Sequence, residues 1–318
     1  MKTEWTTKDI PSQAGRRVLI TGANSGIGWE AALELARRGA EIILPARTEA
    51  KANDAIARIR AQVPNAKLIP EVLDLADLKS VHAFAKRVAE MFPGQSLDLL
   101  INNAGVMAVP TRELTVDGYE RQFATNYLGP FALTALLFWS IKPQPGSRIV
   151  TLASGVTNTA KLEFDNLQSE RRYSPMFQAY SQSKLADLIF QQELQRRLTA
   201  MGSPIFSTGA HPGYAVTNLQ TSGPGENVPF LMRFGMAILK PIASQDAAHG
   251  ALPTLFAATS PEATPGGYYG PSGFQELKGY PVPAKITAAA KNVALAERLW
   301  TESERLTGVT FGALSDAA

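Results

Sequence analysis

The sequence predicts an α/β fold: a single domain built on a doubly wound parallel sheet of about seven strands, with helices on both faces. From residue 16 onward, short apolar segments alternate with longer segments of helical periodicity. The strand segments are apolar almost throughout, which is typical of strands that are covered on both faces. No linker rich in Pro, Gly or Ser divides the 318 residues, so one large domain is favoured over two.

The expected strands lie at residues 17–21, 41–45, 67–73, 97–101, 148–152 and around 204–206, and helices are expected at 27–38, 49–62, 78–91 and 117–141. Six βα units with right-handed crossovers form a Rossmann-type sheet. We expect a core at residues 13–260 and an insertion at 155–177. A second addition is the apolar segment at 219–243. A C-terminal extension at 264–318 is expected to end in a helix near 284–306.

The composition excludes several kinds of chemistry. The chain has no cysteine, which excludes disulfides, iron–sulfur clusters, zinc knuckles and a cysteine nucleophile. Its three histidines, at positions 82, 211 and 249, do not have metal-ligand spacing, so no metal site is expected. A net charge of +3 is too even to suggest a nucleic-acid or anionic-membrane partner. Hydroxyls, amines, carboxylates or a cofactor must therefore carry the chemistry.

No membrane span or signal peptide is expected. The longest apolar stretch, residues 127–141, has about 15 residues, short of the roughly 20 that a bilayer requires. It is better interpreted as a buried helix. The first 15 residues lack the apolar run of a signal peptide, so a cytoplasmic location is expected.

A glycine-rich segment, TGANSGIG, lies between the first predicted strand and the first predicted helix. Glycines in this context allow a tight turn and let backbone N–H groups approach a pyrophosphate at the helix N-terminus. Glycine also serves ordinary turns, but the strand-to-helix context favours nucleotide binding. The candidate binding residues are Gly22, Asn24, Ser25, Gly26, Ile27 and Gly28.

The end of the second predicted strand indicates which nucleotide would bind. NAD sites place an acidic residue about 20 residues after the glycines, where it holds the ribose 2′-hydroxyl. This chain has Ala46 there, followed by Arg47 and Thr48. A guanidinium can pair with a 2′-phosphate, and no carboxylate is present to repel it. NADP(H) is therefore favoured over NAD(H), the alternative being that Arg47 is a solvated surface residue.

Tyr180 and Lys184 stand four residues apart, on one face of a predicted helix. A neighbouring cation lowers the pKa of a tyrosine, which makes the pair a candidate acid/base for a carbonyl or alcohol oxygen. By itself this spacing is common on helix surfaces. Ser154 follows the fifth predicted strand, where open α/β sheets bind ligands, and Asn126 interrupts an apolar helix. The alternative for Ser154 and Asn126 is a local capping or buried hydrogen bond.

Several motifs occur in a particular order: TGANSGIG, NNAG at 102–105, Asn126, Ser154, Tyr180 with Lys184, and Pro212 with Gly213. In this order they resemble the classical short-chain dehydrogenases/reductases, over about residues 15–258. Finer details are similar to the retinol dehydrogenase and WW-domain oxidoreductase group and to related bacterial carbonyl reductases. These details are TGANSGIG, PAR at 45–47, SQSKLA at 181–186 and HPGYAVT at 211–217.

The resemblance implies a role for each matching residue. Tyr180 would be the catalytic acid or base, and Lys184 would lower its pKa and bind the nicotinamide ribose. Ser154 would orient the carbonyl, and Asn126 would hold a water of the proton relay. Further cofactor contacts are implied for Asp74 and Leu75 at the adenine, for Asn103, Ala104 and Gly105 at the adjacent ribose, and for Pro212, Gly213, Ala215, Val216 and Thr217 at the nicotinamide. The segment 219–243 would be the substrate lid.

Three features depart from the common family pattern. The serine motif reads Ala153-Ser154-Gly155, where relatives often have two serines. Ser154 and Tyr180 are 26 residues apart, about twice the shortest family spacing, because of the insertion at 155–177. The retinol dehydrogenase group carries a similar insertion. Light-dependent protochlorophyllide reductases are similar too but are expected to use a cysteine, which this chain lacks.

The predicted function is NADP(H)-dependent hydride transfer between nicotinamide and a carbonyl or alcohol. The apolar segment at 219–243 favours a bulky hydrophobic ketone or aldehyde, although its side chains could equally pack the lid onto the domain. Alternatives are retinol dehydrogenase-like alcohol oxidation, a non-catalytic NADP(H) sensor, and epimerisation or dehydration on the same scaffold. The resemblance implies pairing through the helices that carry Asn126 and Tyr180, but an insertion just before the tyrosine can obstruct that surface. A monomer or a homodimer is therefore expected.

Overall fold

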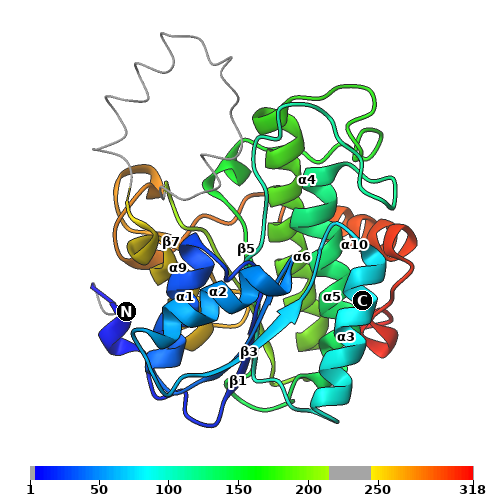
Figure 1. Cartoon of the computed structure of the whole chain (residues 1–318). Helices are drawn as coiled ribbons and strands as arrows, with labels where there is room; N and C mark the ends of the chain where they lie inside the picture. The colour runs from blue at the N-terminus through cyan, green and yellow to red at the C-terminus, as the bar shows by residue number, and fades with distance from the viewer. Residues whose placement is uncertain (1–3, 215–244, 318) are drawn as a thin grey trace.

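The computed structural model describes residues 4–214 and 245–317. Within these residues, eight strands form one sheet in the order β3-β2-β1-β4-β5-β6-β7-β8 (Figure 1). The strands are β1 (Arg17–Ile20), β2 (Glu41–Ala46), β3 (Lys67–Val72), β4 (Leu99–Asn102), β5 (Arg148–Leu152), β6 (Phe206–Ala210), β7 (Tyr268–Pro271) and β8 (Pro281–Pro283). The first seven are parallel and β8 is antiparallel to β7. The predicted α/β fold is confirmed, with one short antiparallel strand added at the edge.

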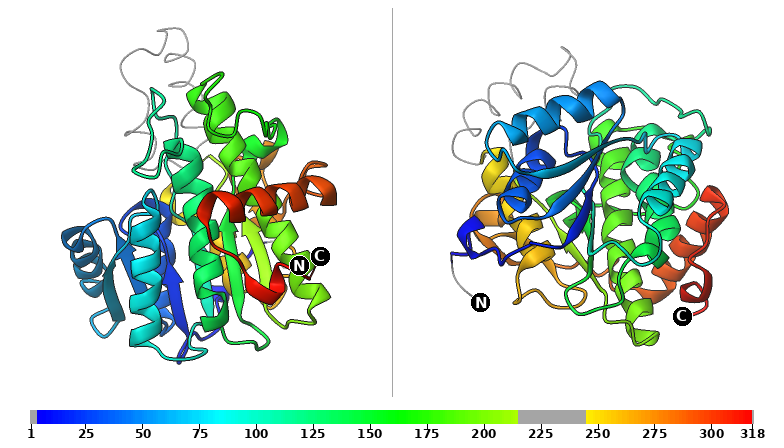
Figure 2. Two further views of the ribbon diagram at one scale, coloured as in Figure 1. Left: turned by 90° about the vertical axis from the view of Figure 1, so that its right-hand side faces the viewer. Right: turned by 60° about the horizontal axis from the view of Figure 1, so that its bottom comes forward.

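Helices cover both faces of the sheet (Figure 2). One face carries α1 (Gly26–Arg37), α2 (Glu49–Arg60) and α9 (Ala247–Thr259), and the other carries α3 (Leu78–Met91), α5 (Gly129–Leu137), α6 (Ser181–Ala200) and α10 (Val293–Thr307). Two separate hydrophobic cores result, one on each face. Leu19 of β1 belongs to the α3/α5/α6 core, whereas its neighbours Val18 and Ile20 belong to the α1/α9 core. Alternate residues therefore face opposite cores, and this is why the strands are apolar without interruption.

The helix expected at 117–141 is shorter and irregular, so that boundary was wrong. Residues 114 and 120 form an isolated antiparallel bridge, and α4 (Arg121–Phe123) begins only after it. The Glu120 carboxylate caps this start by accepting hydrogen bonds from the backbone N–H groups of Gln122 and Phe123, at 3.0 and 2.7 Å. A π-helical turn at Ala124–Leu128 then leads into α5. Such turns are rare and are often found at functional sites.

The sixth strand begins later than predicted. It occupies Phe206–Ala210, a segment containing Ser207, Thr208 and Gly209, whereas the prediction centred on residues 204–206. All of its last four residues are buried. Small and hydroxyl residues are allowed here because Ser207 and Thr208 hydrogen-bond to backbone carbonyls of α6 and α9, at 2.8 and 3.1 Å. The apolar pattern alone did not reveal this strand.

The insertion at 155–177 packs against the loop that follows β4. The Tyr173 hydroxyl donates to the carbonyl of Val109 at 2.5 Å, and Arg112 Nε donates to the carbonyl of Gln168 at 2.8 Å. From α6, Gln182 accepts a hydrogen bond from the backbone N–H of Glu163 at 2.8 Å. The insertion is thereby held beside the helix that carries Tyr180 and Lys184. The apolar segment at 219–243 lies outside the described residues.

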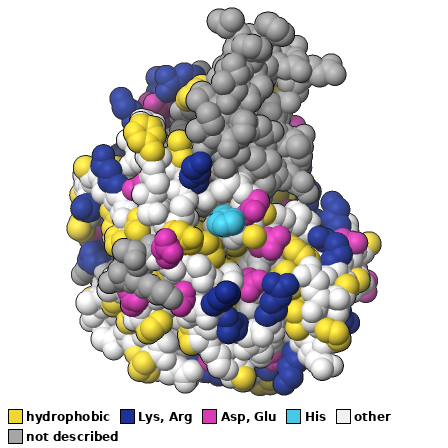
Figure 3. Space-filling view, turned by 90° about the vertical axis from the view of Figure 1, so that its left-hand side faces the viewer, with side chains coloured by type: hydrophobic (Ala, Val, Ile, Leu, Met, Phe, Trp, Pro, Cys, Tyr) yellow, Lys and Arg dark blue, Asp and Glu magenta, His cyan; other side chains and the backbone are white. Residues whose placement is uncertain are grey.

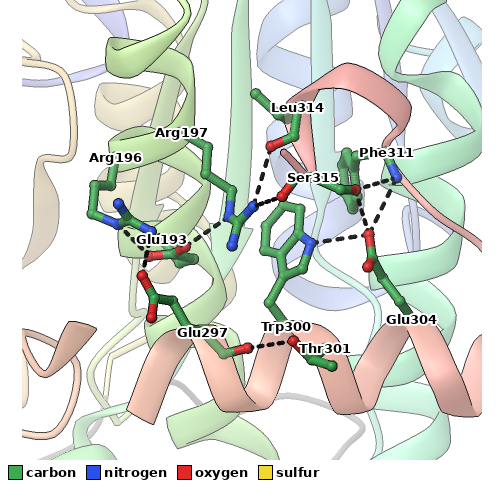
Figure 4. A network of polar contacts seen from close by, with 10 residues as sticks. All are labelled: Glu193, Arg196, Arg197, Glu297, Trp300, Thr301, Glu304, Phe311, Leu314 and Ser315. Carbon is green, nitrogen blue, oxygen red and sulfur yellow. Dashed lines mark hydrogen bonds and ion pairs between the residues drawn. The ribbon is translucent and has the colours of Figure 1, made fainter. Parts of the chain in front are cut away.

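The C-terminal extension belongs to the same domain. It supplies β7 and β8 to the sheet, and α10 packs on α6 and α5. Figure 4 shows how polar contacts attach it: Arg197 of α6 pairs with Glu193 at 2.7 Å and donates to the carbonyls of Leu314, at 3.2 Å, and Ser315. The guanidinium also lies 4.3 Å from the ring centre of Trp300 on α10. In the part of the chain that is described, no helix is long and apolar enough to cross a membrane.

Candidate active site

The candidate site residues gather at the carboxyl ends of the central strands. Thr21 follows β1, Asn103 follows β4 and Ser154 follows β5. The order of the sheet reverses between β1 and β4, since β2 and β3 lie to one side of β1 and β5 to β8 lie beyond β4. In open α/β sheets this switch point is where ligands bind.

The glycine segment and the loop after β4 are joined by Thr21 and Asn103. The Thr21 hydroxyl accepts hydrogen bonds from the backbone N–H groups of Asn103 and Ala104, both at 3.1 Å, and Asn103 Nδ2 donates to the Thr21 carbonyl at 2.8 Å. A Cβ on Gly22 would lie 2.7 Å from the Ala104 Cα, and one on Gly28 would lie 2.3 Å from Asn103 Nδ2. Only glycine allows this close packing, and Gly22 also has a positive φ of 67°.

The packing leaves the N-terminus of α1 directed at the site. Ser25 is the N-cap residue and Gly26 is the first residue of the helix. The first N–H groups of a helix have no partner within the helix, and its dipole favours an anion there. Ile27 is buried beneath the turn. The Asn24 carbonyl accepts a hydrogen bond from Arg58 of α2 at 2.6 Å, so a second cation that sequence reasoning missed lies beside the loop.

Arg47 lies at the end of β2 with its side chain exposed. Within residues 4–214 and 245–317, no hydrogen bond or ion pair engages it, which leaves its guanidinium available to a ligand. Thr48 caps α2 by accepting from the Lys51 N–H at 3.3 Å. The Asp74 carboxylate, after β3, accepts from the Ala76 N–H at 2.9 Å, and Leu75 is buried. Thr48, Asp74 and Leu75 therefore each have a local structural role in addition to any contact with a ligand.

Tyr180 and Lys184 lie at the junction of a second π-helical turn, Pro175–Tyr180, with α6. Lys184 Nζ donates to the Leu152 carbonyl of β5 and to Asp187 Oδ2, both at 2.8 Å. An ammonium has three protons, so one remains for a ligand. Among the described residues, no hydrogen bond involves the Tyr180 hydroxyl. The phenol is partly exposed and is free to contact a substrate.

Ser154 keeps its hydroxyl proton available. Its Oγ accepts a long hydrogen bond, 3.4 Å, from the Val156 N–H, and the described structure gives that hydroxyl no acceptor. Its backbone carbonyl accepts from Thr157 Oγ1 at 2.9 Å, which holds the residue at the start of a 3₁₀ turn. Ser154 is the N-cap residue of a turn that packs against α6, and Tyr180 is the N-cap residue of α6 itself.

Asn126 lies in the first π-helical turn and is 2% exposed. Its Oδ1 accepts from the Val106 N–H at 2.7 Å, and its Nδ2 donates to the Val106 carbonyl and to Ser183 Oγ, both at 2.9 Å. The side chain thus connects the loop after β4 with α6. A Cβ on Gly105 would lie 3.2 Å from Asn126 Oδ1 and 3.7 Å from Lys184 Nζ, which brings the NNAG loop next to the lysine.

The electrostatics of the site centre on Lys184 and Asp187. Burial lowers the pKa of Lys184, but Asp187 and Tyr180 raise it by more, so Lys184 stays an ammonium at neutral pH. Burial raises the pKa of Asp187 to about 7, against the opposing attraction of Lys184. Asp187 was not a predicted site residue. The sequence did contain an indication of this pair, because Asp187 stands three residues after Lys184 on a predicted helix.

The turn after β6 is held by groups far apart in the sequence. His211 is buried, and its Nε2 lies 2.8 Å from Glu276 Oε2, while its Nδ1 accepts from the Gly213 N–H at 3.3 Å. The Pro212 carbonyl accepts from Gln245 at 2.8 Å. Ala215, Val216 and Thr217, which were expected to contact the nicotinamide, lie outside the described residues. Sequence reasoning missed Glu276, because nothing local in the sequence relates it to His211.

A hollow of about 500 Å³ lies at the opposite edge of the sheet, where strands β1, β2 and β3 begin. Of its three basic residues, Arg17 and Lys142 are paired with Glu41 and Asp98, at 2.6 and 2.8 Å, and Lys67 is exposed at the start of β3. In the described ranges, no group of three or more His, Asp or Glu residues is arranged to hold a metal ion.

The site combines a glycine turn, a cation at the end of β2 that has no partner among the described residues, and a phenol, an ammonium and two polar side chains near the carboxyl ends of the central strands. Such a combination is typical of nicotinamide-dependent oxidoreductases. The family model described as short chain dehydrogenase matches residues 16–226. The chain therefore belongs to the short-chain dehydrogenase family, whose members bind a nicotinamide cofactor.

Individual relatives span nearly the whole chain. Mouse retinol dehydrogenase 12 is 37% identical over 307 residues, which covers 96% of this chain and 90% of the relative. A crystal structure from Mycobacterium paratuberculosis, of an uncharacterised protein, is 39% identical with a TM-score of 0.77 and covers 97% of this chain and 99% of that one. The resemblance to the retinol dehydrogenase group is thus confirmed.

A short chain dehydrogenase from Burkholderia cenocepacia, solved in complex with NADP, is 25% identical with a TM-score of 0.60. It covers 80% of this chain and 96% of that structure. The similarity extends the family assignment to a solved structure that contains a nicotinamide cofactor.

Proposed function

We propose that this protein is an NADP(H)-dependent oxidoreductase that transfers hydride between nicotinamide and a hydrophobic carbonyl compound or its alcohol. The observation that carries the proposal is the arrangement around Lys184. Its ammonium is held by Leu152 and Asp187 and interacts electrostatically with Tyr180, whose hydroxyl makes no hydrogen bond in the described structure. A free phenol beside a fixed ammonium suits proton transfer to and from an oxygen atom.

The residues present fit NADP(H). Gly22 and Gly28 keep side chains out of the turn at the N-terminus of α1, which leaves backbone N–H groups for the pyrophosphate. Arg47 would pair with the 2′-phosphate, since its guanidinium has no partner among residues 4–214 and 245–317 and β2 ends without an acid. Asp74, Leu75 and residues 103–105 would surround the adenosine part, and the third Lys184 proton would bind the nicotinamide ribose. Contacts from 212, 213 and 215–217 stay a prediction.

The chain's own residues then divide the work in carbonyl reduction. Bound NADPH would supply a hydride from its nicotinamide C4 to the carbonyl carbon. The Tyr180 hydroxyl donates its proton to the carbonyl oxygen, and the Lys184 ammonium stabilises the phenolate that is left. Ser154 donates a hydrogen bond to the same oxygen. Alcohol oxidation uses the same groups in reverse, with the Tyr180 phenolate accepting the alcohol proton.

In this proposal, Asn126 has a structural role. Both protons of its amide are donated within the protein, to Val106 and Ser183, so its side chain fixes the loop after β4 relative to α6. The water relay that the family resemblance implies for Asn126 stays a prediction. A relay water would have to use the main-chain carbonyl or the second lone pair of Oδ1.

The relatives and the sequence of the segment 219–243 support the proposed substrate class. Retinol, named in the relative from mouse, is an apolar primary alcohol. The segment 219–243 of this chain is rich in Phe, Leu, Met and Ile, which suits an apolar substrate. We therefore propose bulky hydrophobic aldehydes or ketones and their alcohols. The cytoplasmic location expected from the sequence is a prediction that cell fractionation would test.

The packing of α10 supports a monomer. The extension covers α5 and α6, the helices through which the family resemblance implied pairing. Light scattering of the purified chain would show one mass near 34.2 kDa. A mass near twice this value would contradict the proposed monomer.

The experiment that tests the function is a substrate panel. Hydrophobic aldehydes, aryl ketones and retinoid alcohols are mixed with the protein and either NADP(H) or NAD(H), and the absorbance of the reduced nicotinamide is followed. Turnover that is faster with NADP(H) is expected. Tight NADPH binding without turnover of any substrate would favour the alternative, a non-catalytic sensor.

A further inference from the structure

A buried carboxyl group lies one helical turn beyond the proposed catalytic lysine. Asp187 Oδ2 is 2.8 Å from Lys184 Nζ, and their side chains are 2% and 7% exposed. The proton transfer proposed above uses Tyr180 and Lys184, and it gives the negative charge of Asp187 no part in the chemistry. A buried acid costs free energy unless it is paired or neutral, so its presence beside the lysine requires an explanation.

The geometry shows what the acid does to the lysine. Nζ is held from two directions, by the Leu152 carbonyl of β5 and by Asp187 of α6, each at 2.8 Å. A flexible four-carbon side chain is thus restricted to one position, close to the loop after β4, where a Cβ on Gly105 would lie 3.7 Å from Nζ. Removing either acceptor would free the ammonium to move away from Tyr180 and from this loop.

The other ionisable groups that face Asp187 stay neutral. Tyr127, from the π-helical turn before α5, and Tyr268, from β7, both interact electrostatically with Asp187, and burial raises the pKa of each far above the usual value for tyrosine. Tyr127 also shares a hydrogen bond of 2.6 Å with Ser303 of α10. Among the described residues, Lys184 is the charged group that is paired with Asp187, at 2.8 Å.

We infer that Asp187 is a positioning residue of the active site: its carboxyl group fixes the Lys184 ammonium, and its negative charge offsets part of the positive charge that Lys184 exerts on Tyr180. This inference rests on the proposed function, in which Tyr180 transfers the proton. Because burial raises the pKa of Asp187 to about 7, the offset is small in acid and grows above neutral pH.

Two substitutions separate the positioning of the Lys184 ammonium from the effect of the Asp187 charge on Tyr180. Asp187→Asn keeps an oxygen acceptor for Nζ and removes the charge, whereas Asp187→Leu removes both. Asp98→Asn is the matched control, since Asp98 is a buried acid paired with Lys142 at 2.8 Å at the opposite edge of the sheet. For each protein, kcat/KM of alcohol oxidation is measured against pH. The near-ultraviolet phenolate absorbance is titrated in parallel, without cofactor, and the Tyr180→Phe signal is subtracted.

In Asp187→Asn, we expect both the rise in kcat/KM and the Tyr180 phenolate signal to shift to lower pH by about one unit, because Lys184 then acts on Tyr180 without an opposing charge. In Asp187→Leu, we expect kcat to fall by about 100-fold, because Nζ is misplaced. Asp98→Asn is expected to keep the wild-type pH profile.

Unchanged pH profiles and phenolate titration in a folded Asp187→Asn protein would overturn the inference, as would an equal shift in Asp98→Asn. Should Asp187→Leu not fold, the isosteric Asp187→Asn still decides the matter. The phenolate titration needs no substrate or cofactor. A wild-type protein without any turnover would therefore refute the proposed function, while the titration would still test the charge effect of Asp187 on Tyr180.

Discussion

Glu276 Oε2 lies 2.8 Å from His211 Nε2, and this contact joins the segment between β7 and β8 to the turn after β6. Since His211 Nδ1 accepts from the Gly213 N–H, the ring proton is assigned to Nε2, which donates to the carboxylate. Gln275 and Glu276 have positive φ angles of 50° and 57°, which is unfavourable for residues with a side chain. The contact with His211 offsets this strain and fixes the turn after β6.

Glu276→Gln should lower the free energy of unfolding by about 1 kcal/mol at pH 7, because a charge-assisted hydrogen bond is replaced by a neutral one. The hydrogen bond with His211 holds the pKa of Glu276 below its usual value, so this stabilisation is present above about pH 4.5 and is lost as the pH falls through the lowered pKa. Denaturant unfolding at pH 7 and pH 4 checks this. If the free energies of unfolding of wild type and variant differ more at pH 4 than at pH 7, the prediction is contradicted.

Tyr180→Phe should lower kcat by about 1,000-fold or more and leave the Kd for NADPH within about twofold, because only the proton donor is removed. Turnover assays and fluorescence titration with NADPH measure the two quantities. Tyr280→Phe is the control: it removes the same hydroxyl group from a tyrosine that directly precedes β8 and has no part in the proposed mechanism. Retention of most activity in Tyr180→Phe would refute the mechanism.

Arg47→Leu should raise the KM for NADPH by roughly 10- to 100-fold and leave the KM for NADH nearly unchanged, because only NADPH carries the 2′-phosphate. Steady-state kinetics with both cofactors measure the ratio. Lys86→Leu removes the same charge from α3 and controls for net charge. Equal effects on the two cofactors would mean that Arg47 does not recognise the phosphate.

Gly105→Ala should lower kcat by about tenfold with little loss of stability. The added methyl group would lie 3.2 Å from Asn126 Oδ1, so that either the loop after β4 or the Asn126 side chain must move, next to Lys184. Gly155→Ala is a matched control, because the nearest atom to its new Cβ, His211 Nδ1, is 3.9 Å away. Kinetics and thermal unfolding of both variants test the difference, and equal activity of the two would contradict the expected crowding.

Arg197→Met should destabilise the protein by about 2 to 4 kcal/mol, because it leaves the carbonyls of Leu314 and Ser315 without their donor and weakens the pairing of buried Glu193. Arg196→Met is the comparison, since Arg196 also pairs with Glu193 but is 31% exposed. Its expected cost is below about 1 kcal/mol. Denaturant unfolding of both variants provides the measurement, and similar costs would show that burial does not decide the contribution.

The face of the protein in Figure 3 carries basic and acidic side chains interspersed, in agreement with the even charge balance of the sequence.

Composition, periodicity and motif order were sufficient to predict the parallel sheet, the glycine turn and the order of Asn126, Ser154, Tyr180 and Lys184 along the chain. Each of these features depends on residues that are close in sequence or on an apolar strand pattern, which is why they could be read without coordinates.

Helix and strand boundaries were harder to predict, because non-local contacts decide them. Residues 117–120 have helical character in the sequence, but the bridge between Leu114 and Glu120 and the Glu120 cap delay the helix to Arg121. Strand β6 contains Ser207, Thr208 and Gly209. The two hydroxyls are accommodated because α6 and α9 supply carbonyl acceptors, and Tyr268 of β7 and Gln191 of α6 fill the space beside Gly209.

The sequence by itself therefore determined the class of fold, the family and the candidate residues for proton transfer and cofactor binding. Only the tertiary structure decided how these residues are held. It placed Asp187 and Leu152 on the two sides of Lys184, connected His211 with Glu276 and closed α10 over α6. The physical reason is that burial and charge pairing depend on segments distant in the chain, and no local pattern records which of them will meet.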